Sequence, residues 1–227
     1  GYVVLPKAAE ADYSEYTEHI RPLTNAPDNP GKFHVAHLAP ELFTRVIEYP
    51  EVRDLVRWFC GEHARLDNHF VFAYPGQGVS HNIHGGPWSE SRSVYYHSQG
   101  DTFQTSNLKV GISLNDQRGL AVVPGSHKTD MRVRPCDVPK SELTHPRLRQ
   151  ADIIVFTDAL IHGTVHTEQA RAMLYYTFTP GHVCWAEWED LPWHRDVPEQ
   201  RRKFLRKPGM CHVSAEDRTI SWKNSSF

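Results

Sequence analysis

Short apolar stretches separated by turn-forming residues are the feature that most constrains the fold of this chain. The stretches are rich in β-branched and aromatic residues, and they end at turn formers such as Pro75-Gly76 and Pro180-Gly181. They lie at residues 68–74, 108–114, 120–123, 151–157 and 172–179. We therefore expect a mainly β fold with flanking helices, namely a double-stranded β-helix of the jelly-roll or cupin type.

The N-terminal part of the chain carries helix patterns instead of strand patterns. Residues 8–20, 39–47 and 50–63 are predicted to be helical, and Pro50 suits the first turn of the last helix. A run of turn formers at 24–32 predicts a loop after the first helix. We expect these N-terminal helices to pack on the outside of the barrel.

The organisation of the chain is expected to be simple. No internal repeat, low-complexity tract or linker divides the 227 residues, so we expect a single domain over residues 1–227. Within it we distinguish a helical lead-in at 1–66, a catalytic barrel at 67–181 and a C-terminal extension at 182–227. The extension is expected to be helix and coil packed on the barrel.

Composition argues against several classes of partner. The formal net charge of -2 and the sequence pI of 6.8 provide no basic surface for a nucleic-acid polymer or an anionic membrane. No apolar run in the sequence approaches the ~20 residues that cross a bilayer, and no carrier-protein docking module is evident. The cysteines form no CxxC pair, which argues against a zinc site or a disulfide framework and favours a cytoplasmic location.

Two histidines and an arginine form the pattern with the clearest chemical meaning. His84 is followed two positions later by Gly86, His162 comes shortly after the 151–157 stretch, and Arg171 opens the next stretch. In a jelly roll such positions converge at one mouth of the barrel. Two imidazoles and one carboxylate on one face of Fe(II) leave the other face open for a cosubstrate and O2. Here the third position holds glycine, which has no side-chain ligand atom.

The same residues resemble the phytanoyl-CoA dioxygenase family of Fe(II)/2-oxoglutarate enzymes over roughly residues 68–181. The resemblance is carried by the run Leu-Ala-Val-Val-Pro-Gly-Ser-His-Lys at 120–128, the stretch 151–157, His162-Gly163-Thr164 and Arg171. It implies that His84 and His162 are iron ligands and that Arg171 grips a carboxylate of 2-oxoglutarate. Fe(II), 2-oxoglutarate and O2 are therefore the expected cofactors.

Gly86 marks the departure of this chain from the hydroxylases of that family, which carry aspartate or glutamate at the corresponding position. Glycine or alanine there resembles the Fe(II)/2-oxoglutarate halogenases, in which chloride fills the vacated coordination position. Because glycine removes both the anionic ligand and its bulk, a halide has room to bind and to neutralise the iron. We therefore expect Gly86 to mark the chloride site, with chloride as a further cofactor.

Two alternatives to this ligand assignment stay open. If His81 were the ligand instead of His84, Ile83 would hold the third position, which suits neither a hydroxylase nor a halogenase. A carboxylate from elsewhere in the chain would make the protein a hydroxylase with an unusual third ligand. The candidates for that carboxylate are Glu90, Asp101 and Asp158. Asp158 lies in the lead-in to His162, which we expect to form a local turn.

Further residues are expected around the mouth of the barrel. Asn68 or His69, on the strand before the first ligand, would hydrogen-bond the cosubstrate, and strand alternation leaves the choice between them open. Thr164, two positions after His162, would do likewise. Substrate contacts are expected from the segment after the first ligand, where substrate loops normally lie. Its candidate residues are Trp88, His97 and Phe103.

These observations together predict an Fe(II)/2-oxoglutarate-dependent halogenase. It would chlorinate an unactivated carbon of a freestanding small molecule in natural-product biosynthesis. A nucleoside or nucleotide is one substrate class, because the several Arg and His side chains would hold a phosphate. The alternatives are a hydroxylase of the phytanoyl-CoA dioxygenase family, which would be indifferent to halide, and a non-catalytic jelly-roll binding protein, which would bind no iron.

Overall fold

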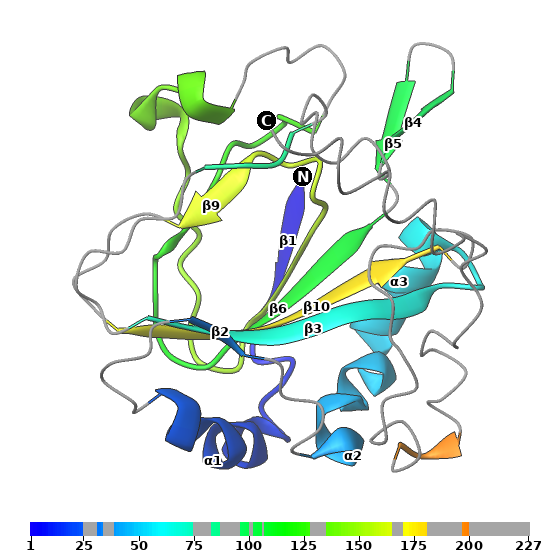
Figure 1. Ribbon diagram of the computed structural model, residues 1–227, viewed down its shortest axis with the longest axis vertical. Coiled ribbons are helices and arrows are strands. Elements are labelled where there is room, and N and C mark those ends of the chain that lie inside the picture. The colour runs from blue at the N-terminus through cyan, green and yellow to red at the C-terminus, as the bar shows by residue number, and fades with distance from the viewer. Residues whose placement is uncertain are drawn as a thin grey trace, which may run out of the picture.

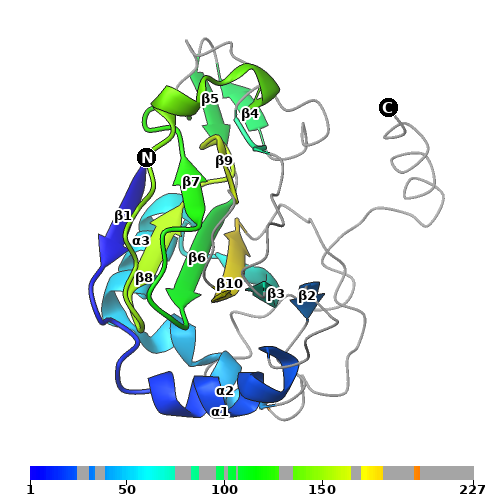
Figure 2. The same cartoon turned by 90° about the vertical axis from the view of Figure 1, so that its left-hand side faces the viewer.

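A six-stranded antiparallel sheet is the main feature of the computed structural model, which describes residues 1–24, 31–33, 39–74, 83–86, 96–99, 102–105, 107–127, 135–164, 170–180 and 197–199. In spatial order its strands are β1 (Tyr2–Leu5), β8 (Ile153–Phe156), β6 (Leu108–Ser113), β10 (Arg171–Thr179), β3 (Arg65–Tyr74) and β2 (Gly31–Phe33). Figure 2 shows this order from one edge of the sheet to the other.

A smaller layer of strands accompanies the large sheet. Strands β7 (Leu120–Val122) and β9 (His162–Thr164) pair antiparallel, and His84 joins them through a bridge to His162. A separate hairpin is formed by β4 (Tyr96–Gln99) and β5 (Thr102–Thr105). Figure 1 shows β9 on one side of the large sheet and helices α1 and α2 on the other. The fold is therefore mainly antiparallel β with a few helices, as expected.

The helices differ in detail from the sequence expectations. Their bounds are α1 (Tyr13–Thr24), α2 (Pro40–Phe43), α3 (Pro50–Cys60) and the 3-10 helices Arg45–Glu48, Pro135–Asp137 and Lys140–Glu142. Helix α1 begins later than expected and continues past Pro22, which lies near its end. The helix expected at 39–47 is broken at Thr44, whose hydroxyl donates to the Pro40 carbonyl at 2.7 Å. Helix α3 ends at Cys60 and is followed by Gly61, whose φ of +81° suits glycine after a helix.

Five of the strands, β1, β2, β4, β5 and β9, were not expected from the sequence. Strand β1 has four residues and pairs with β8, while β2 overlaps the end of the run expected to be a loop. The β4–β5 hairpin falls in the segment expected to be substrate loops. These short segments become strands through their partners, which a local pattern does not reveal.

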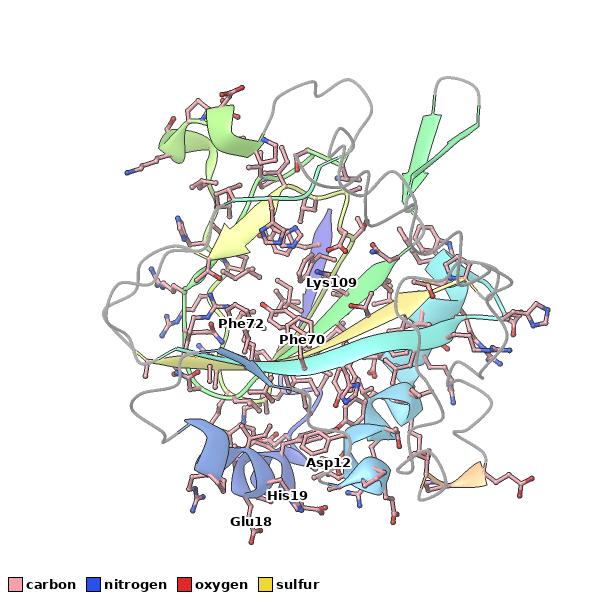
Figure 3. All side chains as sticks on the ribbon, viewed as in Figure 1. Asp12, Glu18, His19, Phe70, Phe72 and Lys109 are labelled. Atoms are coloured by element: carbon pink, nitrogen blue, oxygen red, sulfur yellow. The ribbon has the colours of Figure 1, made fainter. Side chains whose placement is uncertain are left out.

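The two faces of the large sheet have different neighbours. Alternate residues such as Val110, Ile112 and Leu174 pack against α1 and α3 in the larger apolar core. The intervening residues include Phe70 and Tyr175, which belong to a second apolar cluster with residues of β7 and β8. Figure 3 shows Phe70, Phe72 and Lys109 on this second side of the sheet, which we call the inner face, and Asp12 and His19 on the helix side.

The described residues bear only in part on the expectations about membrane spans and the C-terminal extension. None of the described helices is long and apolar enough to cross a membrane. Of the expected C-terminal extension only 197–199 are described, and Val197 is buried in the helix-side core. The single domain over 1–227 stays a prediction.

Candidate metal centre

His84 and His162 lie side by side although they are far apart in the sequence. Each backbone N–H donates to the other residue's carbonyl at 2.8 Å, and the two form an isolated antiparallel bridge. Residues directly opposite in an antiparallel pair project to the same side. The centroids of the two imidazole rings are accordingly 4.3 Å apart. The bridge thus presents two imidazoles to one small volume.

The orientation of His162 leaves one ring nitrogen free for a metal. Its Nδ1 lies 2.6 Å from the Leu160 carbonyl oxygen, which can only accept, so Nδ1 carries the proton and Nε2 the lone pair. Burial, followed by the neighbouring His84 and Lys109, lowers the pKa of His162 to about 3. The ring of Phe156 packs edge-on against it at 4.9 Å. His162 is therefore neutral at pH 7 and held in the tautomer that a metal requires.

Gly86 is required by the backbone of this turn, which the sequence pattern did not reveal. Gly85 and Gly86 adopt φ of +85° and +88°, a region that residues with side chains rarely adopt. A Cβ at position 86 would lie 2.9 Å from Ile161 Cγ1, and one at position 85 would lie 2.6 Å from the Leu160 carbonyl oxygen. The Gly86 N–H donates to the Asp158 carbonyl at 3.2 Å. Position 86 therefore lacks a carboxylate in a tight turn that itself favours glycine.

Asp158 is the carboxylate nearest to His162 among the described residues. Its Oδ1 lies 3.7 Å from His162 Nε2 and 2.7 Å from Lys109 Nζ, and its Oδ2 accepts from Asn107 Nδ2 at 2.7 Å. The Asp158 side chain is only 1% exposed. Within the described residues, no three His, Cys, Asp or Glu side chains gather closely enough to hold a metal ion. Glu90 and Asp101, the other two candidates, lie outside the described residues, as does His81.

Arg171 is a buried cation whose partners among the described residues are all uncharged. It is 3% exposed, and its Nη1 donates to the Gly119 carbonyl at 2.8 Å and to Thr164 Oγ1 at 3.0 Å. Its Nη2 lies 3.6 Å from Met173 Sδ, and its Nε has no hydrogen-bond partner among the described residues. A buried charge is costly without a counter-ion. The guanidinium therefore fits the carboxylate of a small anion.

The position of Arg171 relative to His162 follows from strand geometry. His162 and Thr164 are two residues apart on β9, so their side chains project from the same face about 7 Å apart. Because Thr164 Oγ1 accepts from Arg171, the guanidinium lies next to that face of β9. A dicarboxylate such as 2-oxoglutarate is long enough to reach from the imidazoles to the guanidinium. Thr164 supports Arg171 here, and its expected contact with the cosubstrate stays a prediction.

Strand register separates the two cosubstrate candidates on β3. His69 pairs with Tyr176, which belongs to the helix-side core, whereas Asn68 pairs with Thr177 and is in register with Lys109 on the inner face. His69 therefore faces away from the candidate metal centre. The prediction that it contacts the cosubstrate is wrong. The side chain of Asn68 lies outside the description, so its role stays a prediction.

The expected substrate residues are only partly within the described chain. Trp88 lies outside it, while the backbones of His97 and Phe103 belong to the β4–β5 hairpin, where they pair with Gln104 and Ser98. Figure 1 shows this hairpin at the end of the molecule opposite α1 and α2. Their side-chain contacts are not described, so substrate roles for all three stay predictions.

Sequence reasoning missed two residues that the fold brings to the site. Lys109, on β6, pairs with Asp158, and Tyr175, on β10, donates to Met173 Sδ at 3.1 Å beside Arg171. Burial raises the pKa of Tyr175, and the nearby Arg171 lowers it by less. The alternation of side chains along β6 and β10 could have placed both residues on the same face of the sheet as the site. In the observed register both do lie on the inner face.

Two solved proteins with the same fold have been captured with a metal ion and 2-oxoglutarate. No protein-family model and no curated protein matches this chain. HygX from Streptomyces hygroscopicus, with nickel and 2-oxoglutarate bound, is 19% identical, with a TM-score of 0.64 over 84% of this chain and 86% of that chain. The epimerase SnoN, in complex with Fe3+, alpha ketoglutarate and nogalamycin RO, is 17% identical, with a TM-score of 0.59 over 82% of each chain. At these identities the likeness establishes the fold.

Proposed function

We propose that this chain is a non-heme Fe(II)/2-oxoglutarate-dependent enzyme and, within that class, a halogenase that chlorinates an unactivated carbon. The observation that carries the class is the joint arrangement of His84, His162 and Arg171. Two imidazoles face one volume, and a buried guanidinium, whose described partners are uncharged, lies along the same strand face. The binding of metal and 2-oxoglutarate by HygX and SnoN supports the same class.

The chain's own residues have distinct roles in this proposal. His84 and His162 hold the metal, and the Leu160 carbonyl keeps Nε2 of His162 free for it. Arg171 binds the distal carboxylate of 2-oxoglutarate, and Thr164 holds the guanidinium in place. When bound, iron with 2-oxoglutarate and O2 supplies the oxidising chemistry that attacks an unactivated C–H bond. The inner-face aromatics and the buried strands exclude water from that reaction.

Halogenation is the finer part of the proposal and rests on Gly86. Glycine at position 86 brings no side-chain ligand, and no three described His, Cys, Asp or Glu side chains form a ligand cluster, so we propose that an external anion completes the coordination. Chloride is the anion that we propose. The substrate is a freestanding small molecule, with a nucleoside or nucleotide as one class, and neither a nucleic-acid polymer, a membrane nor a carrier protein is involved. HygX has also been solved with hygromycin B bound, which supports a free substrate.

The proposal keeps the expected fold type and cellular location of the enzyme. We propose a double-stranded β-helix as the finer description of the antiparallel fold and a cytoplasmic location. Cys60 is a free cysteine that is buried and donates to the Phe178 carbonyl, which agrees with a reduced compartment.

A titration without substrate tests the class and the halide together. Fe(II) and 2-oxoglutarate are added anaerobically to the apo-protein, and chloride is then titrated while the visible charge-transfer band is recorded. We expect a band that requires both ligands and shifts with chloride. A band that ignores chloride would favour hydroxylation, and no band at all would favour the non-catalytic binding protein.

The hydroxylase is a second candidate because Asp158 Oδ1 lies 3.7 Å from His162 Nε2. In that case Asp158 would supply the third ligand from within the lead-in to His162. The same titration separates the two candidates, since a protein carboxylate on the metal leaves no position for chloride.

Substitution of Gly86 gives an independent test with a matched control. Gly86→Asp and Gly86→Ala both place a Cβ against Ile161 at a positive φ, and only aspartate adds a carboxylate. We expect Gly86→Asp to abolish the chloride-induced shift and Gly86→Ala to retain it, as measured by the visible band. A folded Gly86→Asp variant that still responds to chloride would contradict the chloride site.

A further inference from the structure

Lys109 and Asp158 form a buried ion pair next to the candidate metal centre. Their side chains are 9% and 1% exposed, and Lys109 Nζ lies 2.7 Å from Asp158 Oδ1. Lys109 pairs with Thr177 on one side and Phe156 on the other, and Phe156 contacts His162. Figure 3 shows Lys109 on the inner face with Phe70 and Phe72. The ammonium is therefore placed between the large sheet and the residues that surround His162.

The Asp158 carboxylate lies near the position that a third metal ligand would occupy, but it does not reach that position. Two ligand atoms that are each about 2.1 Å from one metal, at a right angle, are about 3 Å apart. Asp158 Oδ1 and His162 Nε2 are 3.7 Å apart, so a small rotation of the carboxylate would bring both onto one metal. Nε2 carries a lone pair, so no proton of His162 holds the carboxylate at this distance.

Among the described residues, Lys109 and Asn107 restrain the carboxylate from its other sides. Lys109 contacts Oδ1, the oxygen nearest to His162, and Asn107 donates to Oδ2 at 2.7 Å. The Asp158 backbone is fixed as well, since its N–H donates to Asn107 Oδ1 and its carbonyl accepts from Gly86. Rotation of the carboxylate toward a metal would therefore break the contact with Lys109.

We propose that Lys109 holds Asp158 away from the metal and thereby keeps the third coordination position open to an external anion. This inference rests on the proposed function and assigns Lys109 as a positioning residue that acts through Asp158. The ion pair is neutral as a whole, so an incoming halide meets no uncompensated carboxylate beside the two neutral imidazoles. Without the ammonium, a buried carboxylate this close would take the metal as its counter-ion.

The central test replaces Lys109 by methionine, which has a similar length and no charge. Co(II) serves as the metal probe, in the presence of 2-oxoglutarate, for wild type, Lys109→Met and the double variant Lys109→Met/Asp158→Asn. We expect Lys109→Met to bind Co(II) at least tenfold more tightly than the double variant and to lose the chloride-induced shift of the Fe(II) band. The wild type and the double variant should keep that shift. Equal Co(II) affinities in the two variants would overturn the inference.

A second variant keeps the test decisive if Lys109→Met does not fold without metal. Asp158→Asn preserves an oxygen for Lys109 and removes the carboxylate. Since Asp158 is not a ligand in this proposal, we expect the variant to keep the Fe(II)/2-oxoglutarate band and its chloride response, while the unpaired Lys109 ammonium lowers Co(II) affinity by less than tenfold. A tenfold loss of affinity would overturn the inference and favour Asp158 as the third ligand.

The two levels of the proposal fail in different ways. Absence of the Fe(II)/2-oxoglutarate band in the wild type would overturn the proposed function and the role of Lys109 with it. A wild-type band with unchanged Co(II) binding and chloride response in Lys109→Met would overturn the role of Lys109 alone.

Discussion

The helix side and the inner face of the large sheet each contain a notable arginine, and the two arginines have opposite surroundings. On the helix side, Arg45 donates to Asp12 at 2.9 Å and to Glu15 at 3.2 Å, so its charge has two carboxylate partners. On the inner face, Arg171 is more deeply buried and contacts a carbonyl, a hydroxyl and a sulfur. A folded protein tolerates a buried cation of this kind when an anionic ligand will pair with it.

The same contrast extends to the polar groups around each arginine. Tyr49 donates to Asp12 Oδ2 at 2.6 Å, and the hydroxyls of Tyr16 and Tyr49 are 3.3 Å apart, so the polar groups next to Arg45 are paired with one another. The inner face instead directs the free Nε2 of His162 toward the volume that it shares with His84. We infer that the helix side stabilises the fold and that the inner face is arranged for ligands, which matched variants on the two sides can test.

The largest expected difference concerns a buried histidine on each side. Outer-shell partners alone contribute roughly 10- to 100-fold to metal affinity, so loss of a direct ligand in His162→Ala should weaken Fe(II) binding by more than about 100-fold. His69→Ala, on the helix side, should lower thermal stability and leave Fe(II) affinity nearly unchanged. Anaerobic titration and thermal melting measure both effects. Comparable loss of iron binding in the two variants would remove the distinction between the sides.

Replacement of each arginine by methionine should give the next largest difference. Arg171→Met should weaken 2-oxoglutarate binding by about 30-fold or more, since truncating one partner of a buried charge pair costs about 2–5 kcal/mol. Without 2-oxoglutarate the variant should melt no lower than wild type, because it loses a buried charge with no anionic partner among the described residues.

Arg45→Met is the control for that prediction. Because its ion pairs are partly exposed, it should lose only about 1 kcal/mol of stability, which is a fall of roughly 2–4 °C in a chain of this size. Its affinity for 2-oxoglutarate should not change. Calorimetric titration and thermal melting distinguish the two variants, and a drop in 2-oxoglutarate affinity in Arg45→Met would count against a ligand-specific role for Arg171.

The stability of the apo-protein should depend on pH through His162 on the inner face. The pKa of His162 is lowered to about 3, mainly by burial, from an ordinary value of 6.5 in the unfolded chain. The unfolded chain therefore takes up a proton first, and the stability that His162 contributes above pH 6.5 is lost as the pH falls toward 3. At pH 5 the loss should be about 2 kcal/mol.

His162→Asn isolates that dependence. Its side-chain N–H can still donate to the Leu160 carbonyl, but the side chain does not titrate. Denaturant unfolding of both proteins between pH 7 and pH 5 should show a shallower decrease for the variant. Parallel curves for the two proteins would exclude His162 as the source of the decrease.

The sequence revealed more of the fold than of the polar network around the site. The apolar stretches became β3, β6, β7, β8 and β10, because their strand pattern and their turns are local. The pairing of His84 with His162 and the ion pair of Lys109 with Asp158 depend on strand register between distant segments. Lys109 appears in the sequence as a single charge within an apolar run, and nothing local associates it with Asp158.

Gly86 shows why a ligand pattern alone could not settle the chemistry. Read from the sequence, glycine at this position indicates a vacated ligand position. The turn itself also demands glycine, since position 86 has φ of +88° and a Cβ would contact Ile161. Both explanations hold for the same residue, so the sequence pattern does not distinguish them. The Lys109 and Gly86 variants test the halide assignment directly.

A tyrosine on each side gives the smallest and most selective comparison. Tyr49→Phe removes the hydrogen bond to Asp12, and because Tyr49 is only partly buried the loss should be about 1 kcal/mol, or roughly 2–4 °C in thermal melting. Tyr175→Phe removes a donor to the weakly accepting Met173 Sδ, so it should change the melting temperature by less than Tyr49→Phe does. The order should reverse for 2-oxoglutarate affinity, because Tyr175 lies beside Arg171 and Tyr49 is on the other side of the sheet. If Tyr49→Phe affected 2-oxoglutarate binding more than Tyr175→Phe, the two sides would be coupled rather than separate in function.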